Sequence, residues 1–414
     1  MPQFSQKKYK KLGKWIRWLL SCKLFEVGGN ATHTYEDLMQ LPIAAALENS
    51  SIEHMSLIDD RASADAFYHH ANGKLGKGAI QNMIHRYCAE IIKMLKNLWR
   101  TTCFSIAIDY TEDAFYGEKE NPYVVGGKRK DGTNYGFKYL TVSIVDKGMR
   151  FIIFAYPVRK DENADAPLVE KGLKAAHMLG IGIRRALLDR EFYNADIVAM
   201  LCMLGIEFII PSKKDEKFMR MMESITEQKK RNRLPMVFPY VIADYPLRDQ
   251  LVTQVVFREK SNYGNYELHA YITNRPLVKI KEDPYAVQED YRERWAIENA
   301  NKFQDAFNIH TNSANGLVRF LFFALTLLLH NFWVLVNLLA PSFSFSQISL
   351  SLFKEMLAAV LGFVSRRHYK HTQRERWAAF LGCASTSAKI QKNHTLRSWF
   401  ATIRSFGLQF FVPF

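Results

Sequence analysis

Residues 104–109 read FSIAID, and residues 184–189 read RRALLD. In the first stretch large apolar residues alternate with small ones, the period-two pattern of a strand that buries one face. The second is a shorter apolar run that ends in the same residue type. Each stretch therefore predicts a strand whose end presents a carboxylate, Asp109 or Asp189. If the two strands are neighbours in one sheet, these carboxylates meet although they are far apart in the sequence.

The segments after the first strand predict an α/β fold. Strands are expected at 138–145 and 149–158, on either side of the hairpin turn Asp146-Lys147-Gly148. A helix, a strand, a helix and a strand are expected to follow, at 167–179, 184–188, 195–204 and 206–210. Three antiparallel strands followed by parallel strands, with flanking helices, form the mixed sheet of a ribonuclease-H-like core.

The regions around this core differ in pattern. The N-terminal part reads as helical, with a capping box at Thr34 and Asp37, a cap at Ser63 and apolar residues at helical spacing over 80–99. The predicted domains are 1–100, helical and DNA-binding; 101–211, the first part of the core; 212–282, a β-rich insertion with strands at 236–243, 251–259 and 266–273; 283–340, the second part of the core; and 341–414, a helical, basic C-terminal region.

The composition indicates a globular protein with a polyanionic partner. Its 414 residues are 48% hydrophobic, and 56 Lys and Arg against 41 Asp and Glu give a net charge of +15. DNA or RNA is the expected partner, although a cationic protein of the membrane surface has the same balance. The five cysteines are odd in number and never form a C-x-x-C pair, so we expect reduced thiols and a cytoplasmic location.

One segment fits a membrane span as well as a core helix. Residues 320–353 contain no Asp, Glu, Lys or Arg, and 320–339 are largely apolar. His330, Asn331 and Asn337 interrupt the run, and no second span accompanies it. We interpret it as a helix buried in a soluble protein and expect no membrane partner; a membrane protein built around this segment is the alternative.

Paired carboxylates suit phosphodiester chemistry. Two divalent ions about 3.5–4 Å apart activate the attacking oxygen and stabilise the leaving one, and Mg²⁺ or Mn²⁺ prefers oxygen ligands. Asp109 and Asp189 satisfy that requirement, although an Asp after a strand also serves as a turn former or helix cap.

A predicted helix at 290–307 supplies the third carboxylate. Tyr291, Arg294, Glu298 and Lys302 follow one another at spacings of 3, 4 and 4 residues and therefore share one face. An aromatic hydroxyl and two cations beside a carboxylate suit a grip on phosphates next to a metal site. The alternative is a solvated face on which Glu298 and Lys302 form a salt bridge.

At these residues the sequence resembles the DDE transposases of bacterial and archaeal insertion sequences. Tyr291-x2-Arg294-x3-Glu298 matches the Y-R-E part of their Y-R-E-K signature, and residues 188–193, LDREFY, look like their second-aspartate motif. The resemblance implies cut-and-paste transposition with Asp109, Asp189 and Glu298 as catalytic metal ligands for two ions. Its expected partners are the terminal inverted repeats and target DNA, bound by a homodimer. A transposase-derived DNA-binding protein without catalysis is the alternative.

The match departs from the signature at one place, because its Lys position is occupied here by Asp305. Lys302 is the candidate replacement. The loop 126–132 carries Lys128, Arg129 and Lys130, which we expect either to contact DNA phosphates or to form a solvated hairpin tip. Basic clusters at 366–371 and 374–376 are expected either to contact DNA or a second subunit or to form solvated faces. Five acidic residues near the site are interpreted as non-catalytic: Glu112, Asp113, Asp146, Glu191 and Glu293.

Overall fold

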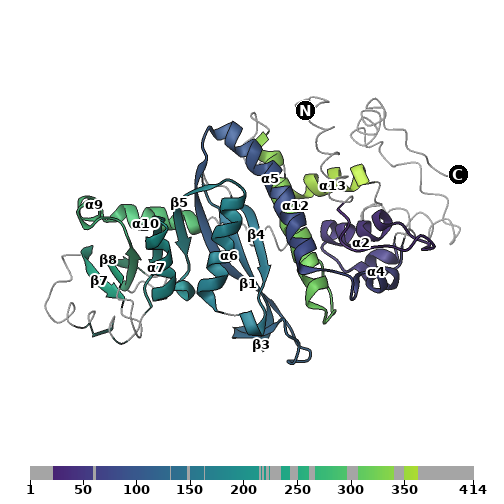
Figure 1. Cartoon of the computed structure of the whole chain (residues 1–414), viewed down its shortest axis with the longest axis horizontal. Coiled ribbons are helices and arrows are strands. Elements are labelled where there is room, and N and C mark those ends of the chain that lie inside the picture. The colour runs from purple at the N-terminus through teal and green to yellow at the C-terminus, as the bar shows by residue number, and fades with distance from the viewer. Residues whose placement is uncertain are drawn as a thin grey trace, which may run out of the picture.

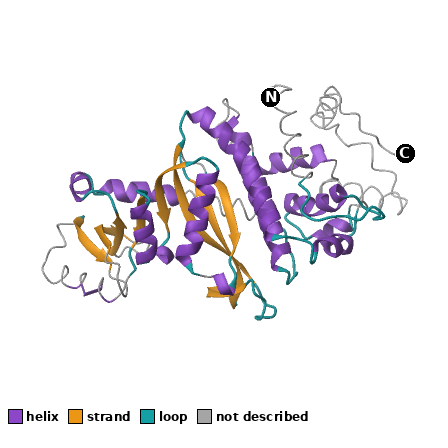
Figure 2. Ribbon diagram, viewed as in Figure 1, coloured by secondary structure: helices purple, strands orange, loops and turns teal. Residues whose placement is uncertain are grey.

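A mixed sheet with helices on both faces forms the centre of the molecule (Figure 2). The computed structural model describes residues 22–58, 62–130, 132–146, 150–162, 164–213, 216, 219–220, 223, 235–242, 250–260, 266–295, 306–339 and 349–361. Within them the strands are β1 (Cys103–Ala114), β2 (Val124–Lys130), β3 (Thr133–Ile144), β4 (Phe151–Pro157), β5 (Gly182–Leu188), β6 (Glu207–Pro211), β7 (Met236–Ile242), β8 (Gln250–Lys260) and β9 (Tyr266–Thr273).

The strand order confirms the predicted α/β sheet. It runs β2-β3-β1-β5-β6-β9-β8-β7, and β4 also pairs with β3. β1 is antiparallel to β3, and β3 to β4, whereas β1, β5 and β6 are mutually parallel. The sequence analysis missed β2, which forms a hairpin with β3 across Asp131-Gly132, a dipeptide typical of tight hairpin turns.

The placement of Asp109 within its strand differs from the prediction. β1 does not end there but continues to Ala114, because residues 110–114 still pair with β3. The parallel neighbour is shorter, and its last pair with β1 is Ile108 with Leu188. Asp109 thus lies mid-strand, beside the end of β5. Asp189 is the first residue after that strand.

The two faces of the sheet are covered by different helices. Helix α6 (Asp165–Met178) packs on β3 so closely that a Cβ added at Gly172 meets Val142 at 2.7 Å. Helix α7 (Ala195–Met203) follows the short turn η2 (Arg190–Phe192) and precedes β6. On the opposite face, Tyr139 of β3 stacks on Phe323 of α12 (Gly316–Leu339) at 4.1 Å between ring centroids.

The N-terminal helices pack against this core. Figure 1 shows α5 (Lys77–Trp99) and α12 side by side, with α2 (Tyr35–Glu48) and α4 (Ala64–Ala71) beyond them, and the short α3 (Ile52–Ser56) follows α2. The predicted capping box at Thr34 and the cap at Ser63 are both present. Phe67 stacks on Phe322 and belongs to the same hydrophobic cluster as the sheet, so the described N-terminal residues share the core of the sheet and its helices.

The β-rich insertion extends the central sheet. β7, β8 and β9 are antiparallel, and β9 pairs with β6. Helices α9 (Leu277–Glu282) and α10 (Tyr285–Arg292) follow, and α10 passes into the turn η4 (Glu293–Trp295). The start predicted for the helix 290–307 is too late, because α10 begins five residues earlier, at Tyr285. The first part of the predicted range, 290–295, is the end of α10 followed by a 3-10 turn.

The apolar segment is a core helix. Helix α12 is the one described helix long and apolar enough to cross a membrane, and 89% of its most apolar stretch is buried inside the protein. Arg319 at its start pairs with Asp113 of β1 at 2.6 Å. Helix α13 (Leu350–Leu361) packs near its other end through Phe353 and Phe332.

Asn331 of α12 acts on the sheet as a neighbouring strand would. Its amide accepts from the Ile152 N–H at 2.9 Å and donates to the Ile152 carbonyl at 2.7 Å. Both groups are buried, so without Asn331 the N–H loses its partner and the carbonyl retains only the thiol of Cys88.

We expect Asn331→Leu to lower the free energy of unfolding by about 1–3 kcal/mol, because a buried donor is left unpaired. Urea denaturation of the full chain measures this. Asn97→Leu, the same replacement at an exposed position of α5, should change stability by less than about 0.5 kcal/mol. Equal effects of the two substitutions would contradict this role of Asn331.

Candidate active site

Asp109 and Asp189 share one cation. Arg294 of η4 places Nη1 3.5 Å from Asp109 Oδ2 and Nη2 3.4 Å from Asp189 Oδ1. The parallel pairing of Ile108 with Leu188 brings the two strands to this point, and Asp189 is the first residue after β5. The two predicted aspartates and the predicted arginine therefore form one cluster.

Burial and charge act against each other on Asp109. Burial raises the pKa of its carboxyl above the ordinary value, the positive charges of Arg294 and Arg150 oppose this rise, and Asp189 adds to it. The Tyr110 N–H donates to Asp109 at 3.0 Å. Asp189 is more open, with 38% of its side chain exposed, so the cluster is accessible from solvent on that side.

Tyr291 anchors the end of α10, just before the turn that carries Arg294. Its hydroxyl donates to the Leu188 carbonyl at 3.4 Å, one residue before Asp189. Its ring packs on Tyr271 of β9 and lies 5.4 Å from the guanidinium carbon of Arg294. Burial raises the pKa of the hydroxyl, which therefore stays neutral. Tyr291 is buried, so in this state it contacts the sheet.

Several predicted site residues lie where the structure does not describe them. Glu298, Lys302 and Asp305 fall in 296–305, and the basic clusters at 366–376 lie beyond residue 361. Lys128, Arg129 and Lys130 belong to β2 of the hairpin rather than to a flexible loop, and their side chains are outside the description. Among the described residues no three metal-binding side chains gather, and the third carboxylate expected here is Glu298.

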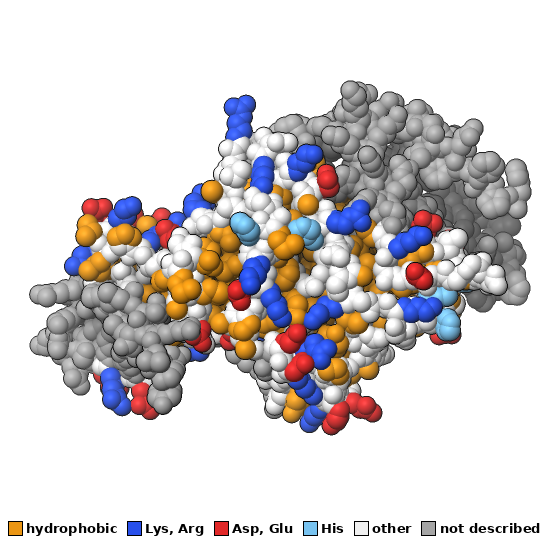
Figure 3. Space-filling model, in the orientation of Figure 1, with side chains coloured by type: hydrophobic (Ala, Val, Ile, Leu, Met, Phe, Trp, Pro, Cys, Tyr) orange, Lys and Arg blue, Asp and Glu red, His pale blue; other side chains and the backbone are white. Residues whose placement is uncertain are grey.

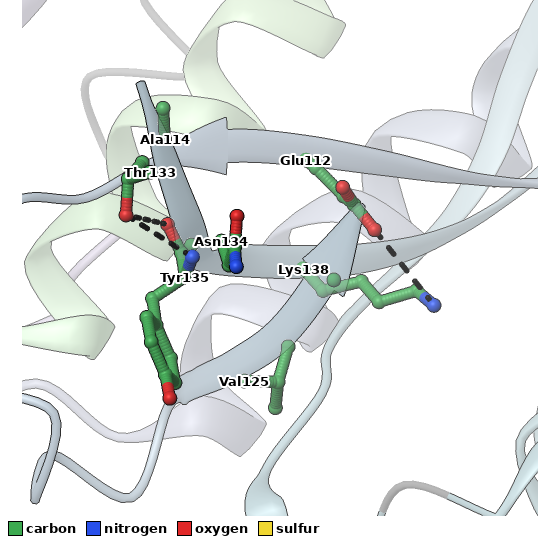
Figure 4. A pocket seen from close by; sticks show the side chains of 9 residues that line it. Glu112, Ala114, Val125, Thr133, Asn134, Tyr135 and Lys138 are labelled. Atoms are coloured by element: carbon green, nitrogen blue, oxygen red, sulfur yellow. Dashed lines mark hydrogen bonds and ion pairs between the residues drawn. The ribbon is translucent and has the colours of Figure 1, made fainter. Parts of the chain in front are cut away.

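Four of the five acidic residues interpreted as non-catalytic have other contacts, whereas Glu293 Oε2 is buried without a hydrogen-bond partner among the described residues. Asp113 pairs with Arg319, and Asp146 accepts from the Ser105 N–H and from Arg184. In Figure 4, Glu112 and Lys138 face each other beside a small pocket between β1, β2 and β3. Lys138 also lies 2.5 Å from Glu191, so Glu191 is engaged by a cation outside the aspartate pair.

Sequence reasoning missed one charged group behind the site. Arg150 is only 3% exposed, and its Nε donates to Ser143 Oγ at 3.1 Å. Burial lowers its pKa to about 10, so the guanidinium is still charged at neutral pH and acts on the neighbouring Asp109. The sequence around Arg150 gives no local sign that this side chain is buried beside Asp109, since its burial depends on the packing of α12.

The exposed charge does not mark a single DNA path on the visible face. In Figure 3, Lys and Arg side chains are spread over several elements with acidic and apolar side chains between them. The site is located by the carboxylate geometry rather than by a basic patch.

The Asp109 carboxyl should make stability depend on pH. Because its pKa is raised in the folded protein, its contribution is favourable at low pH and is lost as the pH rises through the folded-state value. Without divalent metal, Asp109→Asn should therefore gain stability relative to wild type as the pH increases from 3 to 7, with the change beginning near the ordinary pKa of about 4.

Thermal unfolding in EDTA across this range measures the difference. Asp161 is a control of opposite sign, because its hydrogen bond with Arg159 lowers its pKa. Asp161→Asn should lose stability relative to wild type as the pH rises. The same pH trend in both variants would contradict the assignment.

Comparisons with known proteins identify a matching family and a similar solved structure. Residues 106–332 match the family described as "Transposase DDE domain", and this range includes both aspartates and the described Arg294. No curated protein matches the chain. A solved piggyBac transposase synaptic complex with hairpin DNA is similar, with a TM-score of 0.49, 14% identity and coverage of 99% of this chain and 84% of that one. The match over more than half of its length shows that the chain belongs to the DDE transposase family.

Proposed function

We propose that the protein catalyses cut-and-paste transposition of an insertion sequence by hydrolysing phosphodiester bonds and joining the freed 3′-hydroxyl to target DNA. The observation that carries the proposal is the convergence of Asp109 and Asp189 on Arg294. Two carboxylates at adjacent strands, one of them partly open to solvent, form an acidic site that repels a scissile phosphate. Positive charge must therefore be added at this site before it binds DNA.

The donor set fits divalent metal. Asp109 and Asp189 offer hard oxygen ligands, and in this state the cation between them is a guanidinium. Glu298 is the proposed third ligand. Mg²⁺ or Mn²⁺, as two ions, would supply Lewis-acid activation of the attacking and leaving oxygens. The chain's own part is to hold the carboxylates in place, with Arg294 and Arg150 opposing the rise that burial gives to the pKa of Asp109.

Described residues before and after the segment 296–305 contact the same strand. Before it, Arg294 contacts Asp109 of β1; after it, Arg319 contacts Asp113 of β1 and donates to the carbonyls of Ser313 and Thr311. Asp109 and Asp113 are four residues apart on one strand. This double attachment supports Glu298 as the carboxylate that completes the site.

The cations around the site are proposed to grip DNA. Once metal neutralises the aspartates, Arg294 is free to turn to a phosphate, for which a guanidinium has the matching bidentate geometry. Lys302, Lys128, Arg129 and Lys130 are proposed as further phosphate contacts, and the buried Tyr291 as a support for Arg294 beside them. The proposed partners are the terminal inverted repeats and target DNA, held by a homodimer in the cytoplasm.

The main test is metal-dependent cleavage of a duplex that carries the terminal repeat flanking the gene. We expect wild type to cut it with Mg²⁺ or Mn²⁺ and not in EDTA. Asp109→Asn, Asp189→Asn and Glu298→Gln should each lower the rate at least about 1,000-fold, because each removes a metal ligand.

Glu289→Gln is the matched control, since Glu289 is an exposed carboxylate of α10 that precedes Glu298 in the sequence. It should cut like wild type. If Glu298→Gln cuts as fast as this control, Glu298 is not the third ligand. Binding of the repeat without cleavage by wild type would instead favour the non-catalytic DNA-binding alternative.

The substitute for the signature Lys has its own test. Lys302→Ala should weaken binding to the terminal repeat and reduce the slope of log affinity against log salt by about one, as expected for one lost phosphate contact. Asp305→Ala should leave the slope unchanged or tighten binding. Unchanged affinity and slope in Lys302→Ala would remove Lys302 from the DNA interface.

A further inference from the structure

Strand β5 and the residue after it are joined at three successive places to the end of α10 and the turn that carries Arg294. Arg185 Nη1 lies 2.6 Å from Asp290 Oδ1, the Leu188 carbonyl accepts from Tyr291, and Asp189 pairs with Arg294. Residues 185, 188 and 189 thus meet 290, 291 and 294 in the same order along both elements. The last contact is the active site, so the first two determine where Arg294 lies.

The first contact belongs to a network of four charges, named here the Asp290 network: Arg185, Glu207, Arg275 and Asp290. Arg185 Nε lies 2.5 Å from Glu207 Oε1, and Arg275 Nη2 lies 2.6 Å from the same oxygen. Arg275 also pairs with Asp290. Each guanidinium therefore contacts both carboxylates, and the charges balance. The guanidinium side chains are only 14% and 11% exposed, so water screens these pairs weakly.

The network links four parts of the fold. Arg185 is in β5, Glu207 begins β6, Arg275 follows β9, and Asp290 is in α10. Burial alone would raise the pKa of Glu207, but hydrogen bonds from Arg275 and Arg185 outweigh it and hold that pKa below its ordinary value. Glu207 thus serves as an anchor for the two guanidiniums at neutral pH.

The contacts nearer to the site are weaker. The Tyr291 hydroxyl bond is long at 3.4 Å, and the Arg294 contacts are 3.5 and 3.4 Å. Among the described residues, Arg294 Nε is buried without a hydrogen-bond partner. Metal at the aspartates would displace Arg294, so another contact must then keep α10 in register on β5.

We propose that the Asp290 network is this contact: it positions the Arg294-bearing turn over the two aspartates and ties the β7–β9 insertion to the reaction. The inference rests on the proposed function. Partly buried ion pairs contribute little net stability compared with apolar packing, but they fix geometry, and a shift of about 1 Å at a catalytic group can cost about 100-fold in rate. These four residues are positioning residues, since none of them touches the aspartate pair.

The test compares Asp290→Asn with Arg184→Gln in the full-length protein. Arg184 is the neighbouring residue on β5, and its ion pair with Asp146 is also 2.6 Å long but lies outside the network. At saturating terminal-repeat DNA and Mg²⁺, Asp290→Asn should cut about 10–100-fold more slowly than wild type, with DNA affinity within about twofold. Arg184→Gln should cut within about twofold of wild type, and Asp290→Glu, which retains the charge, should recover most of the lost rate.

Hydrogen exchange supplies a measurement that needs no activity. In metal-free protein, peptides covering 285–295 should exchange at least about tenfold faster in Asp290→Asn than in wild type or Arg184→Gln, because the helix opens more often without its anchor. If wild type does not cut DNA, the proposed function fails, but this comparison still decides the positioning role.

Two outcomes would overturn the inference. One is unchanged cleavage and unchanged exchange in Asp290→Asn. The other is a fall in melting temperature and DNA affinity that accounts for all of the lost rate, with no recovery in Asp290→Glu, since the network would then only support the fold.

Discussion

The parallel pairing of β1 with β5 is the constraint on which the site depends. Their last pair is Ile108 with Leu188, and an aspartate follows each of these residues. The two carboxylates therefore meet at one guanidinium. β1 gains its own support from β3, which continues to pair with it to Ala114. Asp109 is thereby fixed in mid-strand, whereas Asp189 lies at a strand end and remains partly open.

The site is built at a cost to stability. Burial raises the pKa of Asp109 and a second carboxylate adds to this rise, whereas Arg294, Arg150 and the hydrogen bond from the Tyr110 N–H oppose it. Arg150 is itself buried against the sheet beneath α12. A cluster of this kind is unfavourable for folding but suited to binding cations, and the surrounding apolar core of sheet and long helices offsets its cost.

Secondary structure within the core followed well from local patterns. The alternation in 104–109, the apolar run before Asp189 and the capping residues Thr34 and Ser63 each predicted elements that the structure confirms. β2 was missed because Gly126 and Gly127 weaken its strand pattern. The start of α10 was misplaced, and β1 was made too short, because residues 110–114 are polar and are stabilised as a strand by pairing with β3 rather than by burying one face.

The sequence by itself predicted which residues would carry the proposed chemistry, and it determined the order of the core elements that present them. Asp109, Asp189, Tyr291 and Arg294 were identified from spacing and from resemblance, since both depend only on local pattern. The tertiary structure alone decided that Arg294 bridges the aspartates, that Arg150 lies behind them, and that Asp290 joins Arg185, Glu207 and Arg275. These contacts join residues that are distant along the chain, and only the pairing of strands and the docking of α10 and α12 brings them within range of one another.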